Sequence, residues 1–450
     1  MQIKFMGAAG TVTGSSYVLT SDSGSSILID LGMFQGPSDL DKLNYEKYDY
    51  DLSTLSGAIL THAHLDHCGR LPILLSGGYK GKIWMTPATR DLTQLSLLDS
   101  AKVAVQDNHP ILYDKELAYK TIDRFKTEEY HVPMEVGGFK VIFHDAGHIL
   151  GSALLEIEDM RSQSSIKKII FSGDLGNTPE DLVPPTETIQ NADAVVMEST
   201  YGDRLHPEED ALQMLQNEVN AVEKSGGTLL IPVFALERTQ EVLHMLMHLK
   251  RTQKVKNSTP IILDSPMAEE ATMIYLQYPQ LLNDHIKQDI KEVGSPFGFE
   301  GLEIIGSRAQ SKGIEHTHGP KVILAGSGMM AGGRIVGHAA YYLSDPSSRL
   351  FIVGYQGEET LGRELMEGKK EVVIEGTTIP VRATVTTTHA MSSHADQQQL
   401  LNWLKQTKNV KKVFLTHGED EPRRALRMRI TQELGISDIT LPTLHQEISF

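Results

Sequence analysis

Short apolar runs that end in a polar residue are the most regular hydrophobic pattern along this chain. The runs are SSILID, LSGAILTH, SIKKIIFSGD, ADAVVMES and KKVFLTH, and they reach Asp30, His62, Asp174, Glu198 and His417. Such runs predict largely buried β-strands that deliver their last side chains to one edge of a sheet. We therefore expect reactive side chains from distant parts of the chain to gather at strand ends.

Between about residues 205 and 385 the pattern changes to an alternation of helices and strands. The amphipathic stretches 207–226 and 236–251 predict helices, and the apolar stretches 228–235, 259–268 and 320–330 predict strands. This alternation predicts a parallel sheet of its own, with the Met-rich EVLHMLMHLKR as a core-facing helix. The predicted organisation is a first domain over 1–204, an inserted α/β domain over 205–385, and completion of the first domain by 386–450.

Length, composition and charge limit the number of domains, the cellular compartment and the class of binding partner that we expect. A length of 450 residues favours two domains over one. The single cysteine, Cys68, excludes an internal disulfide and agrees with a reducing compartment. No apolar run approaches the roughly 18 residues of a membrane span, so we expect a cytoplasmic protein without membrane contact. The net charge of -16 counts against a non-specific polyanion binder, but a nuclease with bound metal ions stays compatible with it.

The segment THAHLDHCGR concentrates potential metal ligands. His62 and His64 alternate and therefore face the same side of an extended segment, and Asp66 and His67 follow on a turn. Three imidazoles and a carboxylate suit zinc or another divalent metal. The alternative is a polar surface loop with chance histidines.

Further ligands are predicted at later strand ends and turns. His148 in HDAGHILGSA is favoured over His144, and Asp174 and His417 end apolar runs. Seven ligands exceed one tetrahedral zinc site, so two metals sharing Asp174 as a bridge are expected. Two divalent ions, two aspartates and a hydroxide leave such a centre at about +1, which favours an anionic substrate.

The signature HxHxDH formed by the first cluster resembles that of the metallo-β-lactamase superfamily. The resemblance implies an αββα sandwich and a hydrolytic di-metal site. It also implies that Asp30, in LIDLGMFQG, orients a ligand without touching the metal. The family pattern assigns one zinc to His62, His64 and His148 and the other to Asp66, His67 and His417, with Asp174 as the bridge.

Other stretches resemble the β-CASP nucleases of this superfamily over essentially the whole chain. MESTYGDR matches motif A with Glu198, MSSHADQQQLLNW matches motif B with His394, and LTHGE matches motif C with His417. IPVFALERTQEVL, LDSPMA, LAGSGMMAGGR and GYQGEETLGR are also similar. The fold class implied is α/β, an αββα metallo-β-lactamase sandwich with an inserted α/β β-CASP domain. Glu237, where many relatives have glycine, is a local departure.

This resemblance implies a metal-dependent ribonuclease in which a hydroxide held by two metals attacks the phosphodiester. Asp66, Glu198 and His394 form the predicted catalytic set, with His394 donating a proton to the leaving oxygen and Glu198 orienting it. The implied cofactors are two Zn²⁺, with Mn²⁺ as the alternative. The implied partner is RNA, expected to be single-stranded, and a homodimer is compatible with the family.

Candidate substrate contacts lie in the family-like stretches of the predicted insertion. Ser327 and Gly328 in LAGSGMMAGG, and Ser265 in LDSPMA, are predicted to cradle a phosphate with neighbouring backbone N–H groups. Arg238 is a predicted contact to the RNA backbone, and the arginines at 334 and 363 could serve likewise. The alternatives are tight turns for the two serines and a solvated helix face for Arg238.

Three other functions stay open at this point. A hydrolase of small esters or thioesters fits HxHxDH but leaves Glu198 and His394 unexplained. A non-catalytic subunit of an RNA-processing complex conflicts with the complete ligand set. A DNA nuclease is disfavoured by His417 at motif C. The sequence does not distinguish endonuclease from 5′-exonuclease action.

Overall fold

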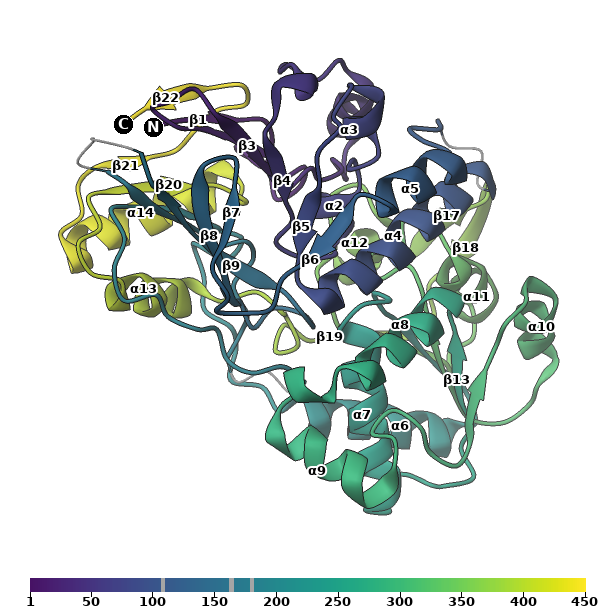
Figure 1. Cartoon of the computed structure of the whole chain (residues 1–450). Helices are drawn as coiled ribbons and strands as arrows, with labels where there is room; N and C mark the ends of the chain where they lie inside the picture. Colours follow the sequence, from purple (N-terminus) through teal and green to yellow (C-terminus); the bar gives the residue numbers. More distant parts are fainter. Residues whose placement is uncertain (107–109, 162–165, 179–181) are drawn as a thin grey trace. The chain divides into compact units, whose positions relative to one another are not determined.

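The computed structural model describes residues 1–106, 110–161, 166–178 and 182–450, and it forms two compact units (Figure 1). Residues Met1–Leu205 and Ser393–Phe450 form one unit, called the sandwich unit here, and His206–Ser392 form the other, called the inserted unit. Ser165, the first residue of one predicted strand run, lies outside the described residues.

The first sheet of the sandwich unit has seven strands. Its order is β22 (Glu447–Ser449), β1 (Gln2–Phe5), β2 (Tyr17–Thr20), β3 (Ser26–Ile29), β4 (Gly57–Ile59), β5 (Ile83–Met85) and β6 (Phe125–Thr127). The strands from β22 to β3 pair antiparallel, and those from β3 to β6 pair parallel. All four residues of β3 are buried, as expected for an apolar strand that is covered on both faces.

The second sheet also has seven strands. Its order is β21 (Ile439–Thr440), β20 (Lys412–Leu415), β11 (Ala194–Met197), β10 (Lys168–Phe171), β9 (Ala153–Asp159), β8 (Phe139–Asp145) and β7 (Met134–Val136). The parallel strands β20, β11 and β10 end side by side. The residues that follow them therefore meet at one edge of this sheet.

The two sheets pack face to face and are covered by helices on their outer faces. Apolar side chains of both sheets, among them Phe5, Ile29, Phe143 and Phe171, form the core between them. The helices are α1 (Ser38–Lys42), α2 (Leu65–Cys68), α3 (Ile73–Ser76), α4 (Pro87–Gln106), α5 (Lys115–Ile122), α13 (Gln397–Gln406) and α14 (Asp420–Leu434). Helices α4 and α5 pack on the first sheet, and α13 and α14 on the second. The predicted αββα sandwich is confirmed.

The inserted unit contains a six-stranded parallel sheet. Its order is β14 (Leu302–Ile304), β13 (Ile261–Asp264), β15 (Lys321–Ala325), β12 (Thr228–Pro232), β16 (Arg349–Ile352) and β19 (Thr384–Thr387), and β17 (Glu371–Ile374) and β18 (Thr377–Pro380) form a hairpin. Its helices are α6 (Ala211–Ser225), α7 (Arg238–Arg251), α8 (Pro266–Gln277), α9 (Asp284–Val293), α10 (Arg308–Gly313), α11 (Arg334–Tyr342) and α12 (Leu361–Met366). The predicted inserted α/β domain with its own parallel sheet is confirmed. Over the described ranges, no helix is long and apolar enough to cross a bilayer.

The insertion begins close to the predicted residue 205 but ends later than residue 385. The predicted boundary falls inside β19, which pairs with β16 and so belongs to the inserted sheet. The chain returns to the sandwich unit at Ser393. There, the backbone N–H of Gln397 donates to the carbonyl of Arg204 over 3.0 Å, which holds the two crossing points of the chain together.

Helix α6 shows how local sequence signals set an element. The carboxylate of Asp210 accepts a hydrogen bond from the backbone N–H of Gln213 at 2.9 Å and caps the N-terminus. The helix ends at Gly226, whose φ of 77° is the left-handed conformation that glycine adopts without strain. The predicted end of this helix at Gly226 is confirmed.

Gly32 allows the loop after β3 to pass against the segment that carries Asp66 and His67. A Cβ atom at Gly32 would lie 1.5 Å from the carbonyl oxygen of Asp66. The flanking backbone is tied to the same segment, because Leu31 N–H donates to the carbonyl of His67 at 2.8 Å. The close approach therefore fixes the path of a predicted ligand segment.

We expect Gly32→Ala to destabilise the sandwich unit by about 1–3 kcal/mol, because two backbone segments must separate to admit the methyl group. Thermal unfolding followed by intrinsic fluorescence measures the change. Gly337→Ala is the control, because Gly337 is an exposed helical residue with open space around it. Equal unfolding temperatures for Gly32→Ala and wild type would contradict this account of the loop.

Candidate metal centre

The structure brings all seven predicted ligands together at one edge of the sandwich unit. His62 and His64 follow β4, Asp66 and His67 lie on α2, His148 lies between β8 and β9, Asp174 follows β10, and His417 follows β20. The ligands form two groups of side chains whose potential donor atoms lie within 4.8 Å of one another. The gathering of polar residues at strand ends is the arrangement that the apolar runs predict.

Asp174 belongs to both groups of ligands. Its Oδ2 lies 3.5 Å from His62 Nε2 and 3.6 Å from His148 Nε2. Its Oδ1 lies 3.3 Å from His67 Nε2 and 3.6 Å from His417 Nδ1. One carboxylate thus presents each of its oxygens to a separate set of imidazoles, which is the disposition of a carboxylate that bridges two ions.

Each group is completed by one more ligand. His64 Nδ1 lies 3.2 Å from His148 Nε2, and Asp66 Oδ2 lies 3.4 Å from His417 Nε2. The first group therefore offers three imidazoles, and the second offers two imidazoles and a carboxylate, besides the shared Asp174. Such mixed nitrogen and oxygen donors suit zinc and similar divalent metals.

The hydrogen-bonding state of these atoms fits a cation. Among the described residues, His62 Nε2 and both carboxylate oxygens of Asp174 are buried without a hydrogen-bond partner. Burying an ionised carboxylate with neither hydrogen bonds nor a cation would destabilise the folded state by several kcal/mol, because the charge loses its hydration. The donor set therefore fits bound metal, and the centre has a metal cofactor.

The protonation states of the histidines agree with ligation. Burial lowers the pKa of His64 to about 4 and lowers the pKa of His62 and His148 well below the usual range of histidine. These rings are neutral near pH 7, as metal ligands must be. Burial also acts on His67, but the carboxylates of Asp174 and Asp30 outweigh it and raise the pKa of this ring. That part of the centre strongly attracts positive charge.

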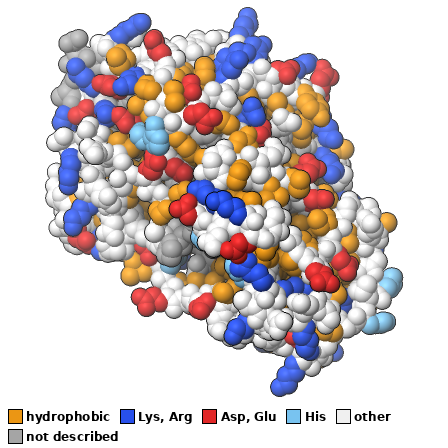
Figure 2. Space-filling model, turned by 60° about the horizontal axis from the view of Figure 1, so that its bottom comes forward, with side chains coloured by type: hydrophobic (Ala, Val, Ile, Leu, Met, Phe, Trp, Pro, Cys, Tyr) orange, Lys and Arg blue, Asp and Glu red, His pale blue; other side chains and the backbone are white. Residues whose placement is uncertain are grey.

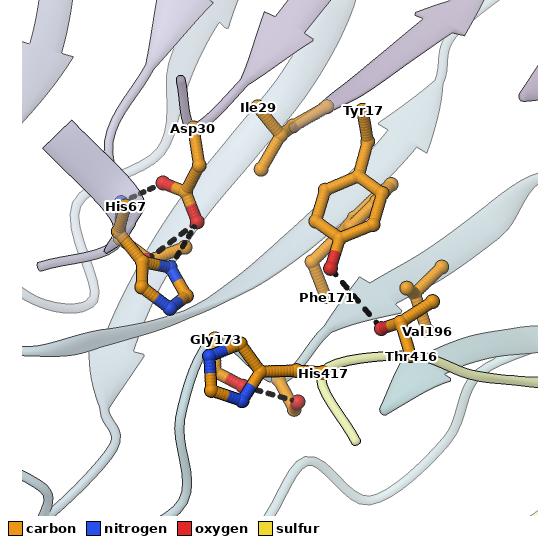
Figure 3. Close-up of a pocket in the computed structure, with 11 residues that line it drawn as sticks. Tyr17, Ile29, Asp30, His67, Phe171, Gly173, Val196, Thr416 and His417 are labelled. Atoms are coloured by element: carbon orange, nitrogen blue, oxygen red, sulfur yellow. Dashed lines mark hydrogen bonds and ion pairs between the residues drawn. The ribbon is translucent and has the colours of Figure 1, made fainter. Parts of the chain in front are cut away.

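Groups outside the ligand set hold three of the rings in place. Asp30 Oδ2 lies 2.8 Å from His67 Nδ1 (Figure 3). The carbonyl of Ser393 lies 3.0 Å from His148 Nδ1, and the hydroxyl of Thr200 lies 3.0 Å from His417 Nδ1. In each case the contact occupies one ring nitrogen and orients Nε2 toward the metal centre, which raises affinity for metal.

Asp30 itself is fixed by Thr61. Its two carboxylate oxygens accept hydrogen bonds from the backbone N–H and the hydroxyl of Thr61, both at 2.8 Å. Figure 3 shows Asp30 and His67 at the wall of a small cavity between the sheets, where the Tyr17 hydroxyl donates to Thr416 Oγ1 at 3.1 Å. Asp30 thus contacts the candidate ligand His67 and lies outside both ligand groups, and its role in orienting a metal ligand stays a prediction.

Glu198 and His394 form a pair beside the shared carboxylate. His394 Nδ1 lies 3.3 Å from Glu198 Oε1 and 3.9 Å from Asp174 Oδ2. The backbone N–H of Leu175 donates to Glu198 Oε1 at 2.6 Å and fixes the carboxylate. Burial would lower the pKa of His394, but the charge of Glu198 and its hydrogen bond raise it to about 9. His394 is thus held in its protonated form, next to the metal ligands.

The sequence candidates for substrate contact lie elsewhere, in the inserted unit. Ser265 follows β13 and Ser327 follows β15, and these parallel strands are neighbours, so both serines lie at one edge of the sheet. The Ser265 hydroxyl accepts from Ala268 N–H and caps α8, and the Ser327 hydroxyl donates to the carbonyl of Gly332 at 3.2 Å. Gly328 packs directly against the ring of Phe234. A role in phosphate binding stays a prediction for these three residues.

The three candidate arginines of this unit already form ion pairs within it. Arg238 is only 5% exposed and forms an ion pair with Glu241 on the same helix, instead of lying on a solvated helix face. Arg334 pairs with the buried Asp264, and Arg363 pairs with Glu367 at 2.6 Å on the surface. Arg238 would have to leave an internal ion pair to reach RNA, and no sequence pattern predicts its burial.

Two partners of the metal centre were missed by sequence reasoning. Thr200 lies in the motif MESTYGDR, so the motif could have indicated a residue near the metal centre. Threonine is not one of the residue types of the predicted ligand set, however, and it was therefore not predicted. Ser393 acts through its backbone carbonyl, for which no side-chain signal exists. The disfavoured His144 lies outside both ligand groups, 3.1 Å from Glu156 and 3.6 Å from Glu187.

Comparisons with known families and proteins give a consistent result. Three family models match the chain: the metallo-beta-lactamase superfamily over residues 9–214, the Beta-Casp domain over 239–365, and the Zn-dependent metallo-hydrolase RNA specificity domain over 378–442. Together they span nearly the whole chain, and the last match independently supports a metal cofactor.

Individual relatives are similar along most of the chain. Ribonuclease TTHA0252 of Thermus thermophilus is 37% identical over 95% of both chains. Transcription termination factor FttA of Methanocaldococcus jannaschii is 32% identical over 93% of this chain and 67% of its own length. Cleavage and polyadenylation specificity factor 73 of Drosophila melanogaster is 30% identical over 96% of this chain and 62% of its own.

A solved structure gives the same fold at low identity. A protein of unknown function from Enterococcus faecalis V583 aligns with a TM-score of 0.57 and 12% identity over 99% of each chain. At this identity, the likeness concerns the fold alone.

We expect Asp30→Asn to weaken metal binding by about 10–100-fold. Both carboxylate oxygens of Asp30 accept hydrogen bonds, so the NH₂ group of Asn would place a donor against either the N–H of Thr61 or the N–H of His67 Nδ1. Zinc affinity measured by competition with a chromophoric chelator tests this. Asp438→Asn is the control, because Asp438 is an exposed partner of Lys412. Unchanged zinc affinity in Asp30→Asn would show that His67 does not depend on this contact.

We expect His144→Gln to destabilise the protein by about 1–2 kcal/mol at pH 6 and by much less at pH 10. Burial opposes protonation of His144, but hydrogen bonds to Glu156 and Glu187 raise its pKa to about 9. A raised pKa contributes stability below the unfolded value near 6.5, and this contribution is lost as pH rises through about 9. Unfolding temperatures of both proteins across this range test the sign, and a constant difference would contradict it.

Proposed function

The chain belongs to the β-CASP ribonuclease family of the metallo-β-lactamase superfamily, and from this premise we propose that it hydrolyses RNA phosphodiester bonds. The match to an RNA specificity domain and the names of its ribonuclease relatives support RNA as the substrate. The observation that carries the proposal is the Glu198–His394 pair, held beside a carboxylate shared by two ligand groups.

We propose that the centre holds two ions, with zinc favoured by the donor atoms and manganese as the alternative. His62, His64 and His148 would hold one ion, Asp66, His67 and His417 the other, and Asp174 both. Two divalent ions in such a site activate water for attack and neutralise charge on the phosphate oxygens. Asp66 contributes to catalysis by completing the group that contains His417.

His394 is the proposed general acid. Its Nδ1 faces Glu198, so a proton for the leaving oxygen would come from Nε2. Glu198 positions the ring and favours its protonated form, and Leu175 N–H in turn holds Glu198. Hydrolysis would break the bond between phosphorus and the 3′-oxygen, place the proton of His394 on that oxygen, and leave a 5′-phosphate and a 3′-hydroxyl.

The charge distribution does not favour attraction of RNA by the protein surface as a whole, but it allows attraction at particular sites. Among the described residues visible in Figure 2, blue basic side chains are interspersed with red acidic ones and do not form one continuous basic surface. The net charge of -16 agrees with this picture. Attraction of the phosphate backbone would therefore depend on the ions at the centre and on short-range contacts.

Backbone contacts of the inserted unit are the proposed source of further RNA binding. The stretches after β12, β13, β15 and β16 follow neighbouring parallel strands at the carboxyl edge of the sheet. Ligands of open α/β sheets commonly bind at this edge. Ser265, Ser327 and Gly328 belong to these stretches, and we propose that they contact single-stranded RNA.

The competing functions explain less of the molecule. A hydrolase of small esters has no need of the Glu198–His394 pair or of a separate inserted unit. A purely non-catalytic subunit has no need of seven converging ligands. We further propose a cytoplasmic location, on the ground of the single buried Cys68, and regard a homodimer as compatible with this function.

We expect His394→Ala to lower RNA cleavage by about 10²–10⁴-fold at unchanged metal content, because it removes the proton donor but no metal ligand. The substrate is a 5′-labelled, 5′-monophosphorylated single-stranded RNA, beside DNA of the same sequence. Product ladders distinguish endonuclease from 5′-exonuclease action. The variant His318→Ala, in an exposed loop, is the control.

Two outcomes would contradict the proposal. Full activity of a metallated His394→Ala would exclude His394 as the general acid. Absence of RNA cleavage by wild type with both ions bound would favour a small-ester hydrolase or a subunit that acts only with a partner.

A further inference from the structure

A second cluster of metal-ligating side chains lies in the inserted unit, outside the proposed active centre. His244 and His248 lie one turn apart on α7, and Asp289 lies on α9 (Figure 1). His244 and Asp289 are buried, and His248 is partly exposed. The sequence pattern of EVLHMLMHLKR predicts a core-facing helix, and most of α7 is indeed buried. What the pattern does not predict is that both histidines face one carboxylate.

Three atoms of this cluster form a nearly equilateral triangle. His244 Nε2 lies 3.0 Å from Asp289 Oδ2, His248 Nε2 lies 2.9 Å from the same oxygen, and the two nitrogens lie 2.9 Å apart. These short distances place two imidazole nitrogens and one carboxylate oxygen around a single point. Such a set of atoms is one of the potential metal-binding groups of the described residues.

No arrangement of protons satisfies all three contacts. If both nitrogens carry a proton toward Asp289 Oδ2, the two N–H groups crowd each other across 2.9 Å. If one nitrogen lacks a proton, its lone pair can accept from the N–H of the other ring, but it then faces the lone pairs of Asp289 Oδ2 at about 3 Å. A cation attracts all three atoms at once and removes this conflict.

A further histidine lies on α9 near this cluster. His285 precedes Asp289 by four residues and therefore lies on the same helix face, one turn away. Its ring centroid is 5.8 Å from that of His244. Two helices thus present one pair of potential ligands each, His244 with His248 and His285 with Asp289.

We propose that His244, His248 and Asp289 bind a divalent transition metal of the zinc, cobalt or nickel type, with His285 as the fourth ligand. Imidazole-rich donor sets favour these metals over magnesium and calcium, which prefer oxygen ligands. The ion links α7 to α9. Because α9 buries only Ile286 and Asp289, such a link adds substantially to the attachment of this helix.

Arg251 contacts two of the proposed ligands and competes with metal binding, which can be tested. Its guanidinium donates to His248 Nδ1 at 3.1 Å and to Asp289 Oδ1 at 2.9 Å. A neutral His248 that binds metal through Nε2 carries its proton on Nδ1. This N–H would then face an N–H of Arg251, and two donors cannot form a hydrogen bond with each other. Metal binding therefore requires Arg251 to withdraw from Nδ1, which its 38% exposed side chain permits. Glu292, 3.6 Å from the guanidinium, offers it another partner.

The test counts zinc ions bound to the full-length chain. Metal-stripped wild type, His248→Ala and the control His316→Ala are titrated with zinc, and native mass spectrometry gives the number of ions retained per chain. We expect His248→Ala to retain one ion fewer than wild type and His316→Ala to retain the same number. Circular dichroism confirms that each variant is folded, and the partial exposure of His248 makes its substitution tolerable.

Crystals of the zinc-soaked wild type provide a second readout that does not depend on a variant. An anomalous peak at the zinc edge between His244, His248 and Asp289 is expected. Equal ion counts for wild type and His248→Ala, or no anomalous peak at this position, would overturn the proposal. Neither readout depends on RNA cleavage, so the outcome is independent of the proposed function.

Arg251→Gln tests the proton argument. The Gln amide oxygen accepts a hydrogen bond from a protonated Nδ1, so the substitution should raise zinc affinity at this site several-fold. The same competition with a chromophoric chelator measures it, in a comparison of wild type and Arg251→Gln. Weaker or unchanged zinc binding in Arg251→Gln would contradict the assignment of Nε2 as the ligand atom of His248.

Discussion

A single buried carboxylate organises the sandwich unit. Asp174 faces four imidazoles within 3.3–3.6 Å and forms no hydrogen bond among the described residues. A charge so placed is stable only with positive charge beside it, which agrees with a metal cofactor at this centre. Asp174 follows β10, and His62 and His417 follow β4 and β20, so the two sheets set these positions, whereas Asp66 and His67 are placed by α2.

Neighbouring residues contact the candidate ligand rings on the side away from the metal centre and so fix which ring nitrogen faces it. Asp30, Thr200 and the carbonyl of Ser393 each occupy one ring nitrogen and leave the other for metal. Glu198 likewise occupies one ring nitrogen of His394, and the other nitrogen is the one for which we propose proton donation. In the proposed mechanism, the same kind of contact to one ring nitrogen would serve both metal ligation and proton transfer, depending on what the second ring nitrogen meets.

How much the sequence predicts depends on what kind of signal a feature leaves. The gathering of His62, Asp174 and His417 was predictable because they end apolar runs, and the glycine at 226 marked the end of α6. The return of the chain at Ser393 was not predictable, because β19 (TVTT) is mostly polar, is not buried, and lacks the apolar run that marks other strands. Burial of Arg238 and the meeting of α7 with α9 at Asp289 depend on tertiary packing, which leaves no periodic trace.

The place where the inserted unit leaves and rejoins the sandwich has an evolutionary consequence. The two crossing points are held together by the hydrogen bond from Gln397 to Arg204, so the segment between them is a loop with closed ends. Closing a long loop costs little more than closing a short one. A lineage could therefore exchange or reshape this segment without rerouting a strand of the sandwich. Glu198 and His394 lie in the sandwich unit, shortly before the chain leaves it and just after the chain rejoins it, so such an exchange would leave them and the candidate metal ligands unchanged.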